Sequence, residues 1–386
     1  MKESVTMNTL EQQMYEWVRD VLERRLSMKE LSILSSKSYR QCQRIVAAVR
    51  VSGMFGVKHG NCGRISKNRI NEALAETIRD LIRDKYFDFN LTHLREKLFE
   101  VENIVIARES LRKIAHSVGV PKKARTRRRK KVHCLRPRMP REGMLIQFDG
   151  SEHQWFTNSK MISTLIGGID DASGKIVGLE FSCSEDTFSC FRVMRSIAEQ
   201  HGVPNAYYLD QAAHFGKMNR EQADTQIGRA LLETGSKIIL ASAPQSKGRV
   251  ERLWGTLQDR LIAELRLRGI NRIPAANDYL REEFIEDFNN RFGVEAREKE
   301  TAFKSLPTGM NLDLVFGIKE RRKIAANHTF HFLGQQYALT TDQDLRYRTV
   351  EICSNQTGEL RFLIYGKEYQ ATQVEKLVSK IFKSAA

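Results

Sequence analysis

Three acidic residues occupy positions from which they could act on one ligand: Asp149, Asp210 and Glu251. Asp149 lies near the end of MLIQFDG and Asp210 ends NAYYLD, and both runs are rich in the apolar and aromatic residues typical of strands. Glu251 falls in the first turn of a helix that follows the loop 244–248. Because ligands gather where the carboxyl ends of parallel strands meet, we expect the three side chains to lie together at one edge of a sheet.

Carboxylates that are brought close together repel one another unless a cation lies between them. Mg²⁺ suits such a site, because it prefers hard oxygen ligands and accepts one or two carboxylates together with phosphate oxygens. Two such ions can polarise a phosphodiester, activate an attacking hydroxyl or water, and stabilise the leaving oxygen. The acidic trio therefore predicts a site for two Mg²⁺ ions, or Mn²⁺ in their place, that acts on a nucleic-acid backbone.

Each of the three residues also has a purely structural interpretation. The run FDGS at Asp149 is a good hairpin turn, and Asp210 could cap a strand end. A glutamate in a first helical turn, such as Glu251, is favoured by the helix dipole. Asp170 and Asp171, the nearest competitors for a metal site, are expected in a turn before the following strand. The joint placement of the trio favours a catalytic role over three separate structural ones.

The chain carries a formal net charge of +16, which points to a polyanionic partner. Segment 121–141 holds eleven basic residues, three prolines and no acidic residue, as expected of a linker that binds phosphates, although a solvated charge run is the alternative. Five basic residues stand together within it: Arg127, Arg128, Arg129, Lys130 and Lys131. Four cations near Glu251 are also expected to meet DNA phosphates: Lys247, Arg249, Arg252 and Arg260.

The N-terminal part has helical periodicity, with apolar residues three and four positions apart in LEQQMYEWVRDVLERRL. A short helix over 28–34, a Ser-Ser turn and a second helix over 39–49 make the outline of a helix-turn-helix. Four residues are expected on the exposed face of its second helix, where base or phosphate contacts are made: Ser38, Arg40, Gln41 and Arg44. A similar pair of helices is predicted within 91–117, with Thr92 as the cap of the first. Plain helical bundles contain such pairs too.

From position 144 onward the pattern changes to alternating strands and helices. Three strands followed by β-α-β-α units predict a mixed five-stranded sheet with helices on its faces. The last portion has short alternating runs and turn residues, which predict a small β-barrel or sandwich of four or five strands. The expected parts are a helix-turn-helix domain (1–65), a second helical domain (66–120), a basic linker (121–141), a catalytic core (142–295), a linker (296–318) and a small β domain (319–386).

Several motifs together carry a family resemblance: MLIQFDGSEHQWF, LIGGIDDASGKIVGLEF, YYLDQAAHFG and SAPQSKGRVERLWGTLQDRL. In this order they resemble the integrase-type core of bacterial DDE transposases, a ribonuclease-H-like fold shared with retroviral integrases. GRVERLWGTLQDRL and FIEDFNNRF are most similar to insertion-sequence transposases of a group held as not yet classified. Two departures are the longer interval between Asp210 and Glu251 and the lack of the zinc-binding His and Cys set at the N-terminus of retroviral integrases.

The resemblance implies that Asp149, Asp210 and Glu251 form the metal-binding triad. It implies binding of terminal inverted repeats by the helix-turn-helix domains, cleavage at the ends of an insertion sequence, and attack of the freed 3′-hydroxyl on target DNA. Such enzymes work as multimers on paired double-stranded DNA ends. Two alternatives stay open, a catalytically inactive regulator derived from a transposase and a nuclease on the same fold that cuts without joining.

Other classes of function are disfavoured by the sequence. No apolar run approaches the roughly 18 residues of a membrane span, so we expect a cytoplasmic protein that joins the nucleoid when bound to DNA. The six cysteines form no C-x-x-C pair, which argues against a structural zinc site. The run GGIDDASGK lacks the spacing and the final Ser or Thr of a phosphate-binding loop, so no nucleotide cofactor is expected.

Overall fold

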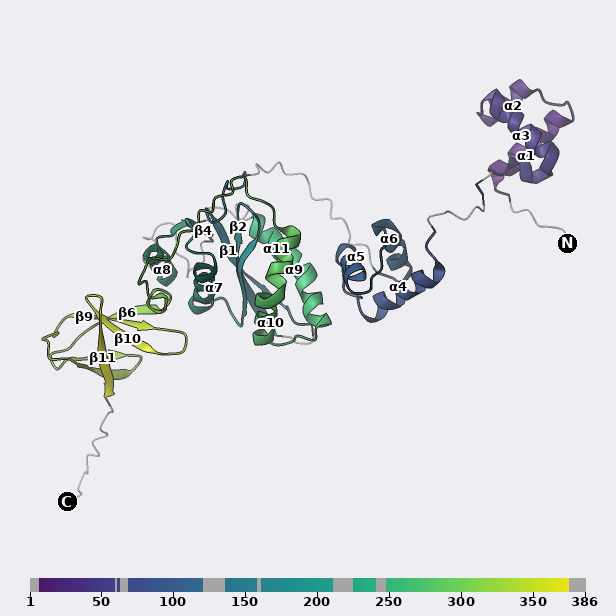
Figure 1. Ribbon diagram of the computed structural model, residues 1–386. Helices are drawn as coiled ribbons and strands as arrows, with labels where there is room; N and C mark the ends of the chain where they lie inside the picture. The colour runs from purple at the N-terminus through teal and green to yellow at the C-terminus, as the bar shows by residue number, and fades with distance from the viewer. Residues whose placement is uncertain are drawn as a thin grey trace, which may run out of the picture. The chain divides into compact units, whose positions relative to one another are not determined.

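The computed structural model describes residues 7–59, 61–62, 69–120, 136–157, 161–210, 225–240 and 248–374. Two compact units, Met1–Thr77 and Ile78–Ala386, divide the chain and are described separately below (Figure 1). The predicted DNA contacts at 127–131 and at Lys247 lie outside the described residues. Within the described ranges, none of the helices has the length and apolar character needed to cross a membrane.

The first unit is a cluster of short helices: α1 (Thr9–Leu22), α2 (Met28–Ser35), α3 (Tyr39–Ser52) and the 3₁₀ helix η1 (Gly53–Val57). Each of the three α-helices begins with a capping box, in which the N-cap side chain and the third helical residue satisfy each other's backbone N–H. Ser36 ends α2 in the left-handed conformation, at φ 51°. The apolar faces of the helices share one core: Met14, Val18, Leu31, Cys42, Val46 and Val49. The predicted pair of helices joined by a polar turn is confirmed.

Three more helices follow: α4 (Glu72–Asp84), α5 (Leu91–Glu100) and α6 (Arg108–Ser117). α5 begins earlier than the sequence predicts, because Asn90 and not Thr92 is its cap. The Asn90 side chain accepts hydrogen bonds from the backbone N–H groups of Thr92 and His93. Asparagine is among the best residues at this position, since its short side chain reaches the free N–H groups of the first turn.

The centre of the second unit is a five-stranded mixed sheet, as predicted (Figure 1). Its strands are β1 (Ile146–His153), β2 (Ser163–Asp170), β3 (Ile176–Ser182), β4 (Ala206–Leu209) and β5 (Lys237–Leu240). The strand order is β3-β2-β1-β4-β5. β1 to β3 are antiparallel neighbours, whereas β1, β4 and β5 run parallel to one another. β1 is therefore the strand at which the pairing changes from antiparallel to parallel.

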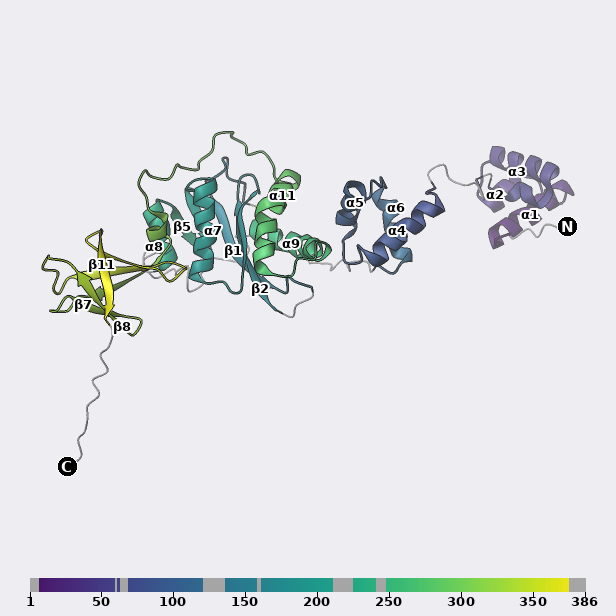
Figure 2. The same ribbon diagram turned by 60° about the horizontal axis from the view of Figure 1, so that its bottom comes forward.

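Helices cover both faces of this sheet (Figure 2). One face carries α7 (Thr187–Gln200) and α8 (Gln226–Thr234), and its core includes Ile146, Phe148 and Tyr207. The other face carries α9 (Gly248–Leu267), α10 (Ile273–Tyr279), the π-helical turn η4 (Leu280–Phe284) and α11 (Ile285–Phe292). Successive strand residues point to opposite faces. Because Ile146 and Phe148 face α7, Gln147 and Asp149 face α9.

One sequence interpretation is wrong: Asp149 does not stand in a hairpin turn. β1 continues past Asp149 and Gly150 to His153, and all eight of its residues pair with β2. Asp149 is opposite Gly167 in this register. The run FDGS therefore lies in mid-strand, because the antiparallel partner extends the pairing beyond it. The turn predicted around Asp170 and Asp171 is present between β2 and β3.

The C-terminal part is a second sheet, with six antiparallel strands where the sequence predicts four or five. Its strands are β6 (Ile318–Lys323), β7 (Thr329–Phe332), β8 (Gln335–Thr340), β9 (Thr349–Ser354), β10 (Leu360–Ile364) and β11 (Lys367–Val374). The additional strand is β6, whose sequence IKERRK has no apolar alternation. Among the described strands it pairs with β9 alone, at an edge of the sheet, where few of its side chains need to be apolar. Phe330 on β7 contacts Phe362 on β10 although β8 and β11 lie between them, so the sheet is strongly curved.

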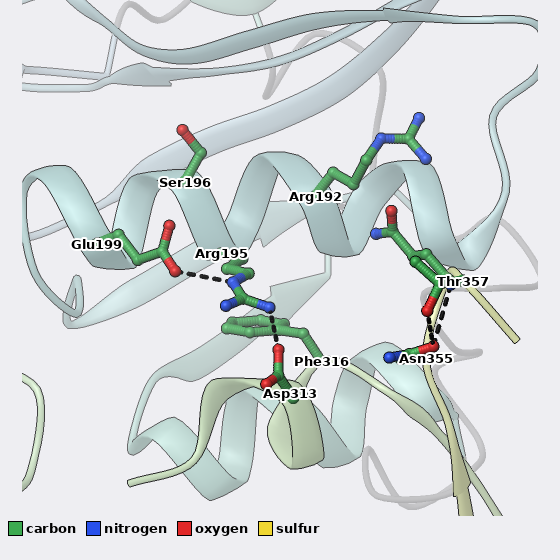
Figure 3. Close-up of a pocket in the computed structure, with 9 residues that line it drawn as sticks. Arg192, Arg195, Ser196, Glu199, Asp313, Phe316, Asn355 and Thr357 are labelled. Carbon is green, nitrogen blue, oxygen red and sulfur yellow. Dashed lines mark hydrogen bonds and ion pairs between the residues drawn. The ribbon is translucent and has the colours of Figure 1, made fainter. Parts of the chain in front are cut away.

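A groove of about 270 Å³ lies where α7 meets the end of α12 (Leu312–Val315) and the turn between β9 and β10 (Figure 3). Arg195 crosses it, donating to Glu199 at 2.8 Å and to Asp313 at 2.5 Å. Gln356 reaches the carbonyl oxygen of Phe188 at the start of α7. These contacts attach α12 and the curved C-terminal sheet to α7, the helix that covers one face of the central sheet.

The outer side of α9 packs against α5 through charged side chains. Glu264 on α9 accepts hydrogen bonds from His93 at 2.8 Å and from Lys97 at 2.7 Å, and its side chain is only 8% exposed. Arg260 donates twice to Glu96, at 2.6 and 3.2 Å. Burial alone would raise the pKa of Glu264, but the hydrogen bonds from His93 and Lys97 lower it to about 2. This carboxylate therefore stabilises the folded unit in its charged form.

We predict that Glu264→Gln lowers the free energy of unfolding at pH 7 by about 3 kcal/mol, because Lys97 and the buried His93 lose the carboxylate that they bind. Since the pKa of Glu264 is lowered by folding, its contribution is complete above the unfolded value of about 4.3 and is lost as the pH falls towards 2. Denaturant titrations of both proteins across this range should converge at the acid end. Glu283→Gln, which removes an exposed partner of Arg268, should cost less than about 1 kcal/mol. Parallel curves for wild type and Glu264→Gln would contradict the assignment.

Candidate active site

The parallel pairing of β1 with β4 brings two of the three predicted carboxylates together. Ile146 is opposite Tyr207 and Gln147 is opposite Tyr208. Continued to the ends of the strands, this register places Asp149 level with Asp210, which directly follows β4. Neighbouring strands are about 4.8 Å apart. Both side chains are partly exposed, so a ligand from solvent can reach them.

The third predicted carboxylate lies on α9, which runs along β1 in a regular register. The backbone N–H of Val250 donates to Gln147 Oε1 at 3.2 Å, and Trp254 Nε1 donates to Asp149 Oδ2 at 3.3 Å. A third contact of the same kind joins Gln258 Nε2 to Ser151 Oγ at 3.3 Å. Four residues of a helix rise about 6 Å along its axis, and two residues of a strand rise about 6.6 Å. Residues four positions apart on α9 therefore meet residues two positions apart on β1.

Glu251 is exposed in the first turn of α9. It stands three residues before Trp254, and residues at this spacing are neighbours on a helix surface. The indole that binds Asp149 is thus next to Glu251 on the same helix. Among the residues that the structure describes, no three His, Cys, Asp or Glu side chains are gathered closely enough to hold a metal ion. In the described part of the chain, Asp149, Asp210 and Glu251 are thus not gathered into a closed set of metal ligands.

A buried carboxylate that the sequence assigns only to a turn has a larger part in the site. Asp171 is fully buried and accepts hydrogen bonds from Gln147 Nε2 at 2.8 Å and Arg249 at 2.8 Å. Arg136 and the backbone N–H of Met139 bind the same carboxylate. Sequence reasoning misses this role because its partners come from three distant segments. The one sequence feature that points to this role is that Asp171 directly follows Asp170 in the turn between two strands.

Two cations expected to meet DNA phosphates have partners inside the protein. Arg249 pairs with Asp171, and burial lowers the pKa of its guanidinium while Asp171 opposes that change. Arg260 is buried and pairs with Glu96 on α5. Phosphate contacts by Arg260 are therefore a wrong expectation, because its charge is used between helices. Arg252, by contrast, is exposed beside Glu251.

The four residues predicted to contact DNA from α3 separate into two pairs. Ser38 and Gln41 form the capping box of α3, with Gln41 N–H donating to Ser38 Oγ at 3.3 Å and Ser38 N–H donating to Gln41 Oε1 at 3.1 Å. Their side chains therefore stabilise the start of the helix. Arg40 and Arg44 are exposed on the same helix, opposite the buried residues of the helical core.

The end of the basic segment belongs to the core. Residues 136–141 lie within the described range, and Arg138 donates to the carbonyl oxygen of Ala172 at 3.0 Å. Arg141 pairs with Glu298 at 3.6 Å, in the segment after α11. The last residues of the expected linker are thus bound to the turn between β2 and β3 and to the segment after α11.

Solved structures of retroviral integrases are similar to this chain at low sequence identity. The catalytic core of HTLV-2 integrase in complex with magnesium gives a TM-score of 0.30 at 15% identity, covering 41% of this chain and 93% of that chain. The intasome of simian T-cell lymphotropic virus, in complex with a PP2A regulatory subunit, gives a TM-score of 0.33 at 12% identity, covering 76% of this chain and 99% of that chain.

Two proteins found by sequence comparison share a higher identity with this chain than the integrases do. No family model matches the chain. It is 29% identical over 365 residues to the transposase for insertion sequence IS1202 of Streptococcus pneumoniae, covering 84% of this chain and 77% of that protein. It is 33% identical over 347 residues to a protein of Sinorhizobium fredii assigned as transposase y4bF, covering 89% of this chain and 75% of that protein. The chain therefore belongs to the family of insertion-sequence transposases.

Proposed function

We propose that this transposase cleaves DNA at the ends of an insertion sequence and joins the 3′-hydroxyl to target DNA, using two divalent metal ions held by Asp149, Asp210 and Glu251. The observation that carries this proposal is the register of β1 and β4, which puts Asp149 level with Asp210. The strand order β3-β2-β1-β4-β5, with helices on both faces, supports a ribonuclease-H-like core. α9 then supplies the third carboxylate from the same face as Asp149.

The donor set fits Mg²⁺ or Mn²⁺. All three side chains offer carboxylate oxygens, and none is fully buried, so water and phosphate oxygens can complete the coordination. The bound ions would activate the attacking hydroxyl and stabilise the leaving oxygen. The chain itself orients the ligands, since Trp254 donates to Asp149 Oδ2 and so fixes the direction of that carboxylate. The exposed Glu251 can turn towards the strand ends without breaking a packed contact.

Double-stranded DNA is the proposed partner, both as transposon end and as target. The three helices of the first unit support a helix-turn-helix with α3 as the recognition helix, where Arg40 and Arg44 are exposed. The basic run 127–131 and the exposed Arg252 would neutralise phosphates. A homo-oligomer assembled on paired ends is part of the proposal, with α5 and α6 as a second DNA-binding pair of helices.

We predict that Glu251→Gln abolishes strand transfer while binding of end DNA persists, because the amide keeps the size of the side chain but loses the charge that holds a metal ion. The assay uses a labelled duplex carrying the repeat from the DNA flanking the gene, with Mg²⁺ and with EDTA. The loss should be at least about 100-fold, and EDTA should abolish the products of the wild type.

Glu282→Gln is the matched control, since Glu282 is an exposed glutamate on η4, away from the strand ends. It should transfer strands at the wild-type rate. A wild-type protein that binds the repeat and never cuts it, with either metal, would reject the proposed chemistry in favour of a regulator derived from a transposase. Cutting without any joined product would favour a nuclease.

We predict that Arg44→Ala weakens binding of the end duplex about tenfold and lowers the slope of log affinity against log salt by about one, because one phosphate or base contact is lost. Arg19→Ala removes the same charge from α1, where Arg19 lies near Glu23, and should change binding little. Fluorescence anisotropy at several salt concentrations measures both quantities. Equal losses in the two variants would mean that α3 is not the recognition helix.

A further inference from the structure

Glu251 lies in the first turn of α9, and its side chain is exposed. Its position must come from its neighbours. The residue before it, Val250, donates its backbone N–H to Gln147 Oε1 at 3.2 Å, and the residue before that, Arg249, binds Asp171. Two consecutive residues are thus held directly before the proposed metal ligand.

Gln147 acts as a cap supplied by another element. The first N–H groups of a helix have no partner within the helix, and Val250 is in the first turn. Gln147 is fully buried, so no water replaces the bond if the side chain turns away. Gln147 is also two residues before Asp149 on the same face of β1. The side chain that accepts from the α9 turn is therefore next to the first carboxylate of the site.

Asp171 fixes which end of the Gln147 amide faces the helix. An ionised carboxylate only accepts hydrogen bonds, so the Gln147 amide must turn its NH₂ group to Asp171, at 2.8 Å. Its oxygen then faces Val250. Asp171 is also fully buried, and the guanidinium groups of Arg136 and Arg249 bind its carboxylate. The orientation of one amide thus depends on a buried ion cluster.

We propose that Gln147 and Asp171 are positioning residues that set the place of Glu251 relative to Asp149 by binding the first turn of α9. The inference rests on the proposed function, in which Glu251 is a metal ligand. Neither residue touches the metal ions or the DNA. Their substitution should weaken metal binding and strand transfer by the displacement of Glu251, and a shift of about 1 Å can cost about 100-fold in rate.

The test uses the full chain, with Mn²⁺ binding by calorimetry and strand transfer measured on each variant, and with thermal unfolding as a check of folding. Gln147→Leu and Asp171→Asn should each weaken Mn²⁺ binding and slow strand transfer by about tenfold or more. Gln258→Leu is the matched control. It removes the equivalent contact between α9 and β1 two turns further along, at Ser151, and should stay within about threefold of wild type.

An exchange variant separates positioning from general damage. In Gln147→Glu combined with Asp171→Asn, the carboxylate and the amide change places. The carboxylate now at position 147 would accept from the Val250 N–H and from the guanidinium groups that now bind Asp171 Oδ1, while the amide now at position 171 would donate to that carboxylate and accept from the Met139 N–H. The net charge of the cluster is kept. Mn²⁺ binding and strand transfer should return to within about fivefold of wild type.

Three outcomes decide the inference. If Gln147→Leu and Asp171→Asn behave like Gln258→Leu while Glu251→Gln is inactive, the inference fails and the proposed function stands. If Gln147→Leu and Asp171→Asn unfold, the exchange variant decides. The inference also fails if that variant is folded but does not bind Mn²⁺. If the wild type transfers no strand but Mn²⁺ binding falls alike in Glu251→Gln and Gln147→Leu, the positioning role holds and the proposed reaction fails.

Discussion

The site depends on the pairing of β1, the strand at which the central sheet changes from antiparallel to parallel neighbours. Its antiparallel pairing with β2 extends the strand to His153, so that Asp149 is held in regular β geometry and not in a turn. Its parallel pairing with β4 brings a second strand end beside it. Alternation along the strand then assigns Ile146 and Phe148 to one core and Gln147 and Asp149 to the face beneath α9.

Polar contacts position the helix on that face, and apolar contacts hold it there. Val250, Leu253, Leu257 and Leu261 bury the inner side of α9 against the sheet, an attraction that has no direction. Sliding by one turn would preserve much of it. The hydrogen bonds to Gln147 and Asp149 are directional and would both be lost by such a shift. The outer side of α9 adds ion pairs to α5, in which Glu264 and Arg260 are buried.

The elements of this fold are largely readable from the sequence, because their apolar periodicity is local. The helices of the first unit and the five central strands follow from such patterns. β6 was missed because its residues are charged at an edge, where burial leaves no pattern. The roles of Asp171 and Gln147 could not be predicted, since they require the turn after β2, the segment at 136–139 and α9 to meet. The ion pairs of Arg249 with Asp171 and of Arg260 with Glu96 could not be predicted for the same reason, since each carboxylate comes from a distant segment of the chain.

The contacts between α9 and β1 also bear on the chain length between Asp210 and Glu251. Among the residues that the structure describes, Gln147 and Asp149 on β1 bind the first two turns of α9 and so hold Glu251 in its place along the sheet. Lengthening a connection costs little free energy, since the closure entropy of a loop grows only with the logarithm of its length. Insertions in this interval can therefore accumulate during evolution while the three carboxylates keep their places. On the proposed function, the length of the interval between Asp210 and Glu251 is a matter of connection, and the contacts of α9 with β1 are what keep Glu251 beside Asp149.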